Sequence, residues 1–418
     1  MNRYRLLLVL LSIPVVIHAA WLALRNKDFK YFSQRLGLMF TPLKNKRVVS
    51  IWIHAASVGE VNAAVPLIHK LAQNNSVILT TNTPSSAVHA NNILSTEVTH
   101  FYCPVDWQWA IRKFILQLRP QCLFIIETEL WPNLFSVCHA MNLPITIVNG
   151  RLSKRTLHTS PWIKKRYQAS LQTTKAILTR SAEDTQRFIK LGAPASIVKT
   201  IGNIKFYQLD SQKDIATFKT VKPYVLAAST RDDEEILIVD AWQEAINKIE
   251  ASSHLLIIVP RHPRRLNTII KQLEKFNLNI AIRSRNETIA ENTDLYIADT
   301  FGELVTFIKG AEFVIMGGSF VNKGGQNILE VAHAQKTVVF GPYMTNFQDE
   351  ALLFVNNKAG IQLENAKALP ETIYSLLTQP AMLEELQHNA VQLMLQQQTV
   401  LDKYLSELQK IYPELKIK

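Results

Sequence analysis

The sequence predicts two doubly wound α/β domains, and its length, composition and patterning carry this prediction. The chain has 418 residues, and a single hydrophobic core stops growing near roughly 250–300 residues, so two domains are expected. Hydrophobic residues make up 47% of the chain and charged residues 19%, which excludes a disordered or low-complexity protein. From Val48 onward, short aliphatic runs alternate with stretches of helical spacing. This alternation predicts parallel sheets with helices between the strands.

The first domain is expected at 31–210, because this part of the chain contains five short β-branched or aliphatic runs. These candidate strands are 48–53, 76–81, 122–127, 145–150 and 176–179. Helical spacing occupies 60–73, 84–94, 107–118, 131–141, 160–172 and 182–191. The pattern then breaks in a polar stretch at 203–222, which we interpret as a linker.

The alternation restarts after Pro223 and predicts a second domain at 211–418. Its candidate strands are 224–229, 254–260, 279–284, 295–298, 313–318 and 337–340. The tail from Pro380 to Tyr412 is rich in Leu and Gln with helical spacing. We therefore expect helices there that pack on the outside of the domain.

The N-terminus combines an apolar segment with strongly basic flanks. Residues 1–47 hold nine Lys or Arg against one acid, and the nineteen residues from Leu6 to Leu24 carry no formal charge apart from His18. About 17–25 apolar residues can span a bilayer, whereas a signal peptide has a shorter apolar core of about 7–15 residues before its cleavage site. We therefore predict an uncleaved membrane anchor helix with its basic flank at 1–30. The larger positive charge after the segment places the bulk of the chain in the cytoplasm, and a helix lying in the inner leaflet fits almost as well.

Several classes of cofactor lose support from the sequence. Three cysteines, Cys103, Cys122 and Cys138, lack the paired spacing of a zinc site or a disulfide framework, which predicts a reducing compartment. Neither GxxxxGK[ST] nor an early GxGxxG occurs, so the ATPase and dinucleotide interpretations lose their main support. No carboxylate cluster indicates a Mg²⁺ site. We expect no metal and no cofactor.

Two glutamates follow predicted strands of the first domain, where open α/β sheets bind their ligands. Glu60 lies in HAASVGEVNAA (54–64), in the first helical turn after a strand. It can act as a general base, or it can simply complement the positive helix N-terminus. Glu129 lies in ETELWPN (127–133), directly after another strand. Its alternatives are a functional carboxylate and a helix N-cap.

Two stretches of the second domain suit a nucleotide. VPRHPRR (259–265) places Arg261 in a proline-stiffened loop after a strand, where an arginine fork can hold two phosphate oxygens. A solvated basic turn is the alternative. In the glycine-rich stretch at 316–349, Asn327 and Glu330 are three residues apart on one face of an expected helix. Paired glycines allow close backbone approach to a ligand, and an Asn with a Glu suits a ribose or a base edge.

Seven motifs together carry a resemblance to a known family. They are HAASVGEV, ETELWPN, GRLSKR, AASTRDDEE, VPRHPRR, DTFGELVTFIKGAEFVIMGGS and KGGQNILEVA. Their combination and order resemble the 3-deoxy-D-manno-octulosonic acid (Kdo) transferases of lipopolysaccharide synthesis. Two departures from the family pattern weaken the base and phosphate contacts: Gln326 stands where His is common, and AASTR replaces AGSTH.

The resemblance implies a GT-B glycosyltransferase fold with two Rossmann-like domains facing a cleft. It implies an inverting reaction that moves Kdo from CMP-Kdo to a lipid A precursor (lipid IVA), with two Kdo residues as our expectation, at the cell inner membrane. Glu60 is then the general base, and Glu129 contributes to catalysis. The residues implied in binding cytidine monophosphate, or in lying near the nucleotide, are Pro260, Arg261, Gly302, Glu303, Leu304, Asn327 and Glu330.

The charge of the chain fits these expected partners. CMP-Kdo carries a phosphate diester and a sugar carboxylate, so Arg261 and backbone donors can stabilise the leaving CMP without a metal. Residues 151–166 hold six basic side chains and no acid, which suits a phosphorylated glycolipid at an anionic membrane surface; a solvated helix face is the alternative. We expect no nucleic acid partner. The competing functions are a GT-B transferase with a UDP-sugar donor, a nucleotide-sugar epimerase of the same fold and a non-catalytic binding protein.

Overall fold

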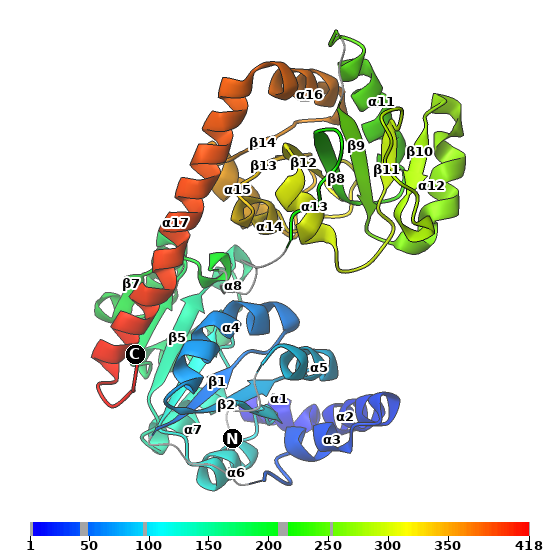
Figure 1. Ribbon diagram of the computed structural model, residues 1–418. Coiled ribbons are helices and arrows are strands. Elements are labelled where there is room, and N and C mark those ends of the chain that lie inside the picture. Colours follow the sequence, from blue (N-terminus) through cyan, green and yellow to red (C-terminus); the bar gives the residue numbers. More distant parts are fainter. Residues whose placement is uncertain (1–2, 42–48, 95–97, 208–215, 251–253, 418) are drawn as a thin grey trace. The chain divides into compact units, whose positions relative to one another are not determined.

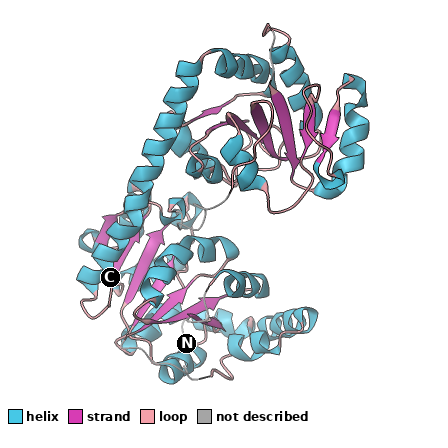
Figure 2. Cartoon of the chain, viewed as in Figure 1, coloured by secondary structure: helices cyan, strands magenta, loops and turns pink. Residues whose placement is uncertain are grey.

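The chain forms two compact α/β units (Figure 1). Unit 1 comprises residues 1–208 and 397–418, and unit 2 comprises residues 209–396. In each unit helices cover both faces of a parallel sheet (Figure 2), which confirms the predicted fold class. The computed structural model describes residues 3–41, 49–94, 98–207, 216–250 and 254–417.

Within the described residues, the sheet of unit 1 has seven strands in the order β3-β2-β1-β4-β5-β6-β7, and neighbouring strands are parallel. The chain order reverses at β1, which pairs with β2 on one side and β4 on the other. A ligand is expected at such a switch point. The strands are Ser50–His54 (β1), Ser76–Thr81 (β2), Val98–Tyr102 (β3), Cys122–Ile126 (β4), Ile145–Gly150 (β5), Ala176–Thr179 (β6) and Val198–Thr200 (β7).

The helices of unit 1 bury an apolar cluster on each face of this sheet. On one face α4 packs on β1, β2 and β4, and on the other α6 and α7 contribute Phe114, Leu134 and Phe135. The helices after β1 are Val58–Ala72 (α4), Pro84–Ile93 (α5), Gln108–Leu118 (α6), Pro132–Ala140 (α7), Lys154–Leu157 (α8), Pro161–Gln172 (α9) and Ala182–Leu191 (α10).

Unit 2 repeats the arrangement: in the part of the chain that the structure describes, its sheet also has seven strands, in the order β10-β11-β9-β8-β12-β13-β14. Its switch point is β8, between β9 and β12. The strands are Tyr224–Thr230 (β8), Leu255–Pro260 (β9), Ile280–Ile282 (β10), Leu295–Ile297 (β11), Phe313–Met316 (β12), Thr337–Phe340 (β13) and Gly360–Gln362 (β14). The helices are Glu234–Ile246 (α11), Leu266–Leu273 (α12), Leu304–Gly310 (α13), Leu329–His333 (α14), Gln348–Asn356 (α15) and Leu369–Thr378 (α16).

The C-terminal tail forms one long helix, α17 (Pro380–Ile411). We expected the tail to lie on the outside of the second domain, whereas its residues from 397 onward belong to unit 1. There Leu401, Tyr404 and Leu408 are fully buried in the core that α4 covers, and the Tyr404 hydroxyl donates to the Gly202 carbonyl at 2.9 Å. The end of the chain is therefore part of the core of the N-terminal unit.

The N-terminal segment differs from the expected anchor. Two helices, α1 (Arg3–Leu10) and α2 (Ser12–Asn26), stand where one continuous helix was predicted, and α3 (Phe29–Arg35) follows. Pro14 lies in the first turn of α2; it has no N–H to donate to the Leu10 carbonyl, so the first helix ends there. None of the helices in the described residues is long and apolar enough to cross a bilayer.

Three strands were not predicted: β3, β7 and β14. Each lies at the edge of its sheet. β3 buries two of its five residues and β7 none, so they lack the continuous apolar runs of the central strands.

Candidate active site

Glu60 follows the switch-point strand of unit 1. Ser57 caps α4 by accepting the Glu60 N–H at 3.3 Å, and its hydroxyl donates to Glu60 Oε1 at 3.0 Å. The Ala56 N–H donates to Glu60 Oε2 at 2.7 Å. This reciprocal pattern is close to a capping box. The carboxylate is thus held at the carboxyl end of β1, where it is half-buried.

Burial raises the pKa of Glu60 to about 7, although the Ala56 N–H lowers it. The negative charge of Glu129 also raises it, and His54 lowers it. A carboxylate with a pKa near 7 can hold a proton and release it at neutral pH, which is the property that a general base needs.

Glu129 follows β4 on the other side of the switch point, and its side chain is 22% exposed. Its Oε2 accepts from the Trp131 indole at 2.5 Å and from Asn82 Nδ2 at 3.4 Å. Burial raises the pKa of Glu129, but the neighbouring His54, with Nε2 at 3.7 Å from Glu129 Oε2, lowers it overall. Glu129 is therefore ionised at neutral pH, beside Glu60.

Sequence reasoning missed His54, the last residue of β1. Its ring is fully buried, with Nδ1 at 2.9 Å from Thr80 Oγ1 and Nε2 at 3.7 Å from Glu129 Oε2. Burial alone would lower the pKa of His54, whereas its contacts with the Cys103 thiol and Glu129 raise it overall. A signal was present: this is a histidine within an apolar strand, six residues before the candidate base. The raised pKa means that the His54 ring carries a buried positive charge beside Glu129.

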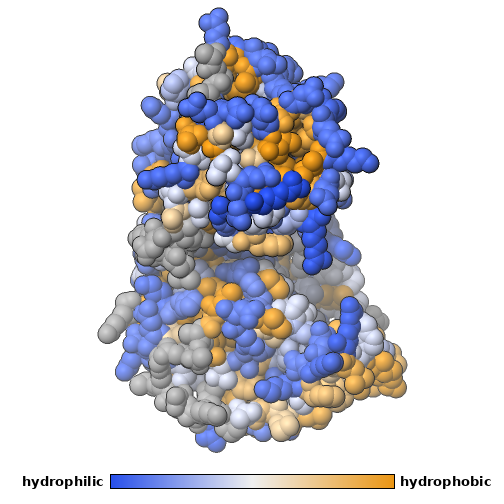
Figure 3. Space-filling model, turned by 45° about the vertical axis from the view of Figure 1, so that its right-hand side comes forward, coloured by the Kyte–Doolittle hydropathy of each residue, from blue (hydrophilic) through white to orange (hydrophobic). Residues whose placement is uncertain are grey.

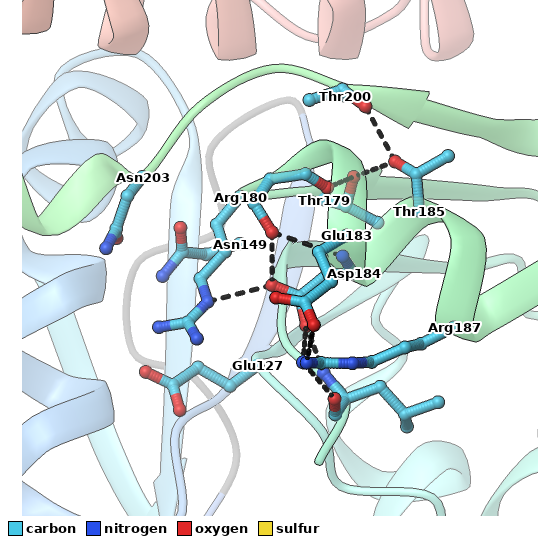
Figure 4. A network of polar contacts seen from close by, with 12 residues as sticks. Glu127, Asn149, Thr179, Arg180, Glu183, Asp184, Thr185, Arg187, Thr200 and Asn203 are labelled. Carbon is cyan, nitrogen blue, oxygen red and sulfur yellow. Dashed lines mark hydrogen bonds and ion pairs between the residues drawn. The ribbon is translucent and has the colours of Figure 1, made fainter. Parts of the chain in front are cut away.

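Glu127 does not join this site, although it lies two residues before Glu129. It has a left-handed backbone (φ 60°), and its Oε1 is 2.8 Å from Lys205 Nζ. It lies near a polar network centred on Asp184 (Figure 4), which accepts from Arg180 Nε at 3.0 Å and from the Leu152 N–H at 2.8 Å. The two acids of ETE therefore diverge.

In unit 2 the switch point is built around the buried carboxylate of Glu234. Its Oε2 accepts the N–H groups of Gly318 at 2.6 Å and Arg231 at 2.8 Å, and its Oε1 accepts that of Phe320 at 2.9 Å. Gly318 has a left-handed backbone (φ 70°) that glycine adopts without strain. Glu234 thus fixes the turn that follows β12.

Arg261 lies at the carboxyl end of β9, directly after the buried Pro260. Its N–H donates to the Thr230 carbonyl at 3.0 Å, and its side chain is exposed. Arg265, in the same loop, is instead tied to Glu235 through Nη1 at 2.8 Å and Nη2 at 3.1 Å. The basic loop therefore combines a structural arginine, Arg265, with two exposed ones, Arg261 and Arg264.

Asn327 and Glu330 lie close together, but not as predicted. Helix α14 begins at Leu329, so Asn327 precedes it and its Oδ1 accepts the Leu329 N–H at 3.1 Å. Asn327 Nδ2 donates to Glu330 Oε1 at 3.2 Å. Burial raises the pKa of Glu330, while Asn327 and the charge of Arg261 lower it.

The DTFGEL segment shows which of its groups are already engaged. Arg283 binds Glu303 through Nη2 at 2.7 Å and Nε at 3.2 Å; this contact lowers the pKa of Glu303. Gly302 is exposed with a left-handed backbone (φ 86°), and nothing lies within 4 Å of the position a Cβ would take. Leu304 starts α13. The open side of this segment is therefore its backbone at Gly302.

Comparisons with known proteins identify the family of the chain. The family described as 3-deoxy-D-manno-octulosonic-acid transferase matches residues 30–208. The 3-deoxy-D-manno-octulosonic acid transferase of Haemophilus influenzae is 32% identical over 376 residues, which cover 87% of each chain. That of Rickettsia prowazekii is 33% identical over 380 residues, 87% of this chain and 80% of the relative. The chain belongs to the Kdo transferase family.

The predicted family and enzyme class are thereby confirmed: this is a glycosyltransferase that transfers Kdo in lipopolysaccharide biosynthesis. Among solved structures, the UDP-GlcNAc 2-epimerase of Neisseria meningitidis is 11% identical, with a TM-score of 0.57 over 87% of this chain and 100% of that one. At this identity the likeness shows the shared two-sheet fold alone.

The described residues of this Kdo transferase contain no group of three or more His, Cys, Asp or Glu side chains arranged to hold a metal ion. The three cysteines are buried and free. The charged groups at the carboxyl ends of the two sheets are the candidates for chemistry and binding because the switch points lie there.

Proposed function

We propose that the enzyme transfers Kdo from CMP-Kdo to a phosphorylated lipid A precursor, lipid IVA, with Glu60 as the general base. The observation that carries this proposal is the half-buried Glu60 carboxylate, whose pKa is about 7, at the carboxyl end of β1. An acceptor hydroxyl loses its proton to Glu60 while its oxygen bonds to the anomeric carbon of Kdo. The bond from that carbon to the phosphate breaks, and CMP leaves with the electron pair. Attack opposite the leaving group inverts the anomeric centre.

Glu129 contributes its charge in this proposal. Its ionised carboxylate raises the pKa of Glu60 and so makes Glu60 a stronger base. The partly exposed carboxylate can also accept hydrogen bonds from acceptor hydroxyls. His54 acts as a positioning residue that holds Glu129 ionised from the buried side.

The donor nucleotide is assigned to the loops of unit 2. Arg261 is exposed at the end of β9, where its guanidinium can bind phosphate oxygens. Asn327 and Glu330 offer hydrogen-bonding groups for the ribose or the base, and the buried Pro260 fixes the end of β9 from which Arg261 projects. The open backbone at Gly302, next to Glu303 and Leu304, allows close approach of the nucleotide.

The acceptor and the membrane are assigned to unit 1. The basic residues of 151–166 suit the phosphates of the glycolipid, and an acceptor that has gained one Kdo offers a new hydroxyl for a second transfer. Apolar side chains also gather on one face over the N-terminal helices (Figure 3). The exposed apolar residues of these helices include Leu10, Ile13, Ile17, Trp21, Leu24 and Phe29. This face suits peripheral binding in the inner leaflet of the inner membrane, on the cytoplasmic side.

A reaction with defined substrates tests the proposal. The purified enzyme is given lipid IVA and CMP-Kdo, and mass spectrometry follows the product to exhaustion; we expect two added Kdo residues. Calorimetry with CMP, UMP and UDP is the companion measurement, and we expect CMP to bind most tightly. Preferential binding of UDP would favour the alternative of a UDP-sugar donor and contradict the proposal.

Vesicle flotation tests the membrane face. We expect wild-type protein to float with anionic vesicles more than with neutral ones, and the pair of changes Ile13→Asp and Ile17→Asp to reduce flotation. Both side chains are exposed, at 72% and 64%, so the fold is expected to tolerate the charges. Unchanged flotation of this variant would reject the assigned face.

A further inference from the structure

A cavity of about 390 Å³ lies inside unit 1, between the N-terminal helices and the loops at the carboxyl end of the sheet. Helices α1 to α3 form one side, and the segments after β2, β3 and β4 form the other. Its walls are mainly aliphatic and aromatic. The apolar lining includes Leu8, Leu11, Val15, Ala19, Val105 and Ile111.

The charged groups that line this cavity are engaged by the protein itself. The carboxylate of Asp106 accepts the N–H groups of Asn133 at 3.0 Å and Leu134 at 2.8 Å, and also the Tyr4 hydroxyl at 2.6 Å. Arg35 Nη1 donates to Asn82 Oδ1 at 3.0 Å and to the Cys103 carbonyl at 2.5 Å. The cavity therefore favours an apolar occupant over a hydrogen-bonding one.

The cavity adjoins the candidate active site. Trp131 lines it and also lines a second cavity of about 230 Å³, whose walls include Glu129, Arg166 and Tyr167. The Trp131 indole donates to Glu129 Oε2 at 2.5 Å. Asn82, from the larger cavity, donates to the same oxygen at 3.4 Å. A single layer of side chains thus separates the apolar space from the catalytic carboxylate.

The charges of the two cavities match the two ends of a glycolipid. The smaller cavity offers the Arg166 guanidinium to a phosphate and Glu129 to sugar hydroxyls, while the larger offers apolar wall. The apolar wall is continuous with the membrane-facing side of the same helix: Val15 lines the cavity, and Ile13 and Ile17 on α2 are 72% and 64% exposed. A chain bent away from a lipid surface therefore stays in apolar surroundings.

We propose that the larger cavity binds one acyl chain of the acceptor while the phosphorylated sugar lies in the smaller cavity beside Glu129. This inference rests on the proposed function, because it assumes a glycolipid acceptor. It assigns a further role to α1 and α2: they form part of the acceptor site as well as the membrane face. The enzyme would thereby distinguish acylated acceptors from free phosphorylated sugars.

Filling the cavity is the direct test. Val15→Phe adds bulk where the chain would lie, and Val88→Phe is the matched control, since Val88 is 61% exposed on α5. KM and kcat are measured for detergent-dispersed lipid IVA and for its sugar bisphosphate after removal of all acyl chains. We expect Val15→Phe to raise KM for lipid IVA at least about tenfold, the factor lost when about two methylene groups are excluded. KM for the deacylated acceptor, and both values in Val88→Phe, should stay near wild type.

A binding measurement keeps the test independent of turnover. Trp107 and Trp131 line the cavity, so lipid IVA with a brominated acyl chain should quench their fluorescence, and Trp107→Phe should lose part of that quenching. Val15→Phe should reduce the quenching as well. Circular dichroism confirms that the variants are folded.

The outcomes distinguish a wrong cavity assignment from a wrong proposed acceptor. Unchanged lipid IVA kinetics and quenching in folded Val15→Phe would overturn the cavity assignment, as would equal losses with both acceptors or equal losses in Val88→Phe. If the wild-type enzyme transfers Kdo to neither acceptor, the proposed acceptor is wrong and the cavity assignment falls with it. Transfer by the wild type with loss only in Val15→Phe, and only for the acylated acceptor, supports both.

Discussion

In both units the switch-point strand is followed by a helix with a glutamate in its first turn, Glu60 after β1 and Glu234 after β8. The surroundings of the two glutamates differ. Glu60, after β1, is half-buried and accepts one backbone N–H and one hydroxyl. Glu234, after β8, is fully buried and accepts three backbone N–H groups. Burial raises the pKa of both carboxyls.

The difference shows what separates a scaffold carboxylate from one that can react. The oxygens of Glu234 are saturated by the turn they hold in place, so they offer nothing to a substrate. Those of Glu60 keep acceptor capacity and exposure, and the negative Glu129 keeps them basic. Exposure and hydrogen-bond number, rather than position in the helix, therefore distinguish the two roles.

The largest effect is expected for Glu60→Gln. Gln keeps the size of Glu and one acceptor oxygen for the helix cap, but it cannot take the proton of the acceptor hydroxyl. Losing a general base costs about 10²–10⁴-fold in rate, so we expect kcat to fall at least about 100-fold. CMP binding by calorimetry should stay close to wild type, and the melting temperature should not fall below that of wild type.

Ser57→Ala is the control for the capping role of Glu60. It removes the N-cap hydroxyl and leaves the carboxylate, so it should cost about 0.5–2 kcal/mol of stability with a much smaller loss of turnover than Glu60→Gln. Near-normal turnover in Glu60→Gln would show that Glu60 is a scaffold like Glu234, and Glu129 would become the candidate base.

Arg261→Ala tests the binding side of unit 2 with the next largest effect. A charge-assisted hydrogen bond to phosphate contributes about 1.5–3 kcal/mol, so we expect donor KM and the CMP dissociation constant to rise about 10- to 150-fold. Acceptor KM should change little. Arg264→Ala is the matched control, because Arg264 is an exposed arginine of the same loop. Equal effects of the two changes would indicate a general loss of positive charge instead of a phosphate site.

His54→Gln tests whether the buried charge behind Glu129 tunes the base. Glu60 must be ionised to act, so wild-type kcat should rise with pH through about 7, the pKa of Glu60. His54 lowers that pKa, and its loss should move the rising limb to higher pH. We expect turnover near neutral pH to fall about tenfold, for roughly 1.4 kcal/mol of lost stabilisation. If the rise of kcat with pH stays at the same pH in His54→Gln, His54 has only a packing role.

The same pKa predicts an opposite trend in stability. The carboxyl of Glu60 binds its proton more tightly in the folded state than at its ordinary pKa of 4.5. The contribution of this carboxyl to the free energy of unfolding is therefore fully present below pH 4.5. It is lost as pH rises through about 7. The melting temperature of the wild type should decline relative to Glu60→Gln across that window, and a constant difference would contradict the raised pKa.

Much of the fold could be predicted, because central parallel strands are buried on both faces and appear as unbroken apolar runs. The strands β2, β5 and β6 lie at the residues expected from the sequence. The edge strands β3, β7 and β14 escaped prediction, since an edge strand is less buried and its sequence is polar or short. The tail was predicted as helical, but periodicity does not say which core a helix covers, and α17 completes that of unit 1.

The sequence could predict only those site residues whose reactive side chains directly follow an apolar strand. Glu60 and Glu129 could be selected because each follows an apolar run, and the structure places both at one switch point. Their pKa values and the contribution of His54 depend on β1 and β4 being neighbours, which no local pattern encodes. Helix α14 likewise starts only at Leu329, later than the glycine pairs suggested, and Asn327 lies before it with its Oδ1 accepting the Leu329 N–H.

The smallest effect on catalysis, and the sharpest contrast with Glu60, is expected for Glu234→Gln. The new amide keeps one acceptor oxygen, but its NH₂ group faces an N–H donor, so at least one buried N–H loses its partner. An unsatisfied buried donor costs about 1–3 kcal/mol, and unit 2 should melt at a lower temperature. Glu244→Gln on the same helix is the control: Glu244 is 59% exposed, and its ion pair is worth about 0–1 kcal/mol. Because Glu234 touches no reacting atom, kcat of the folded variant should stay within about threefold of wild type, a difference of less than about 1 kcal/mol in barrier. A loss of kcat as large as that in Glu60→Gln, with the melting temperature unchanged, would reverse the roles of the two glutamates.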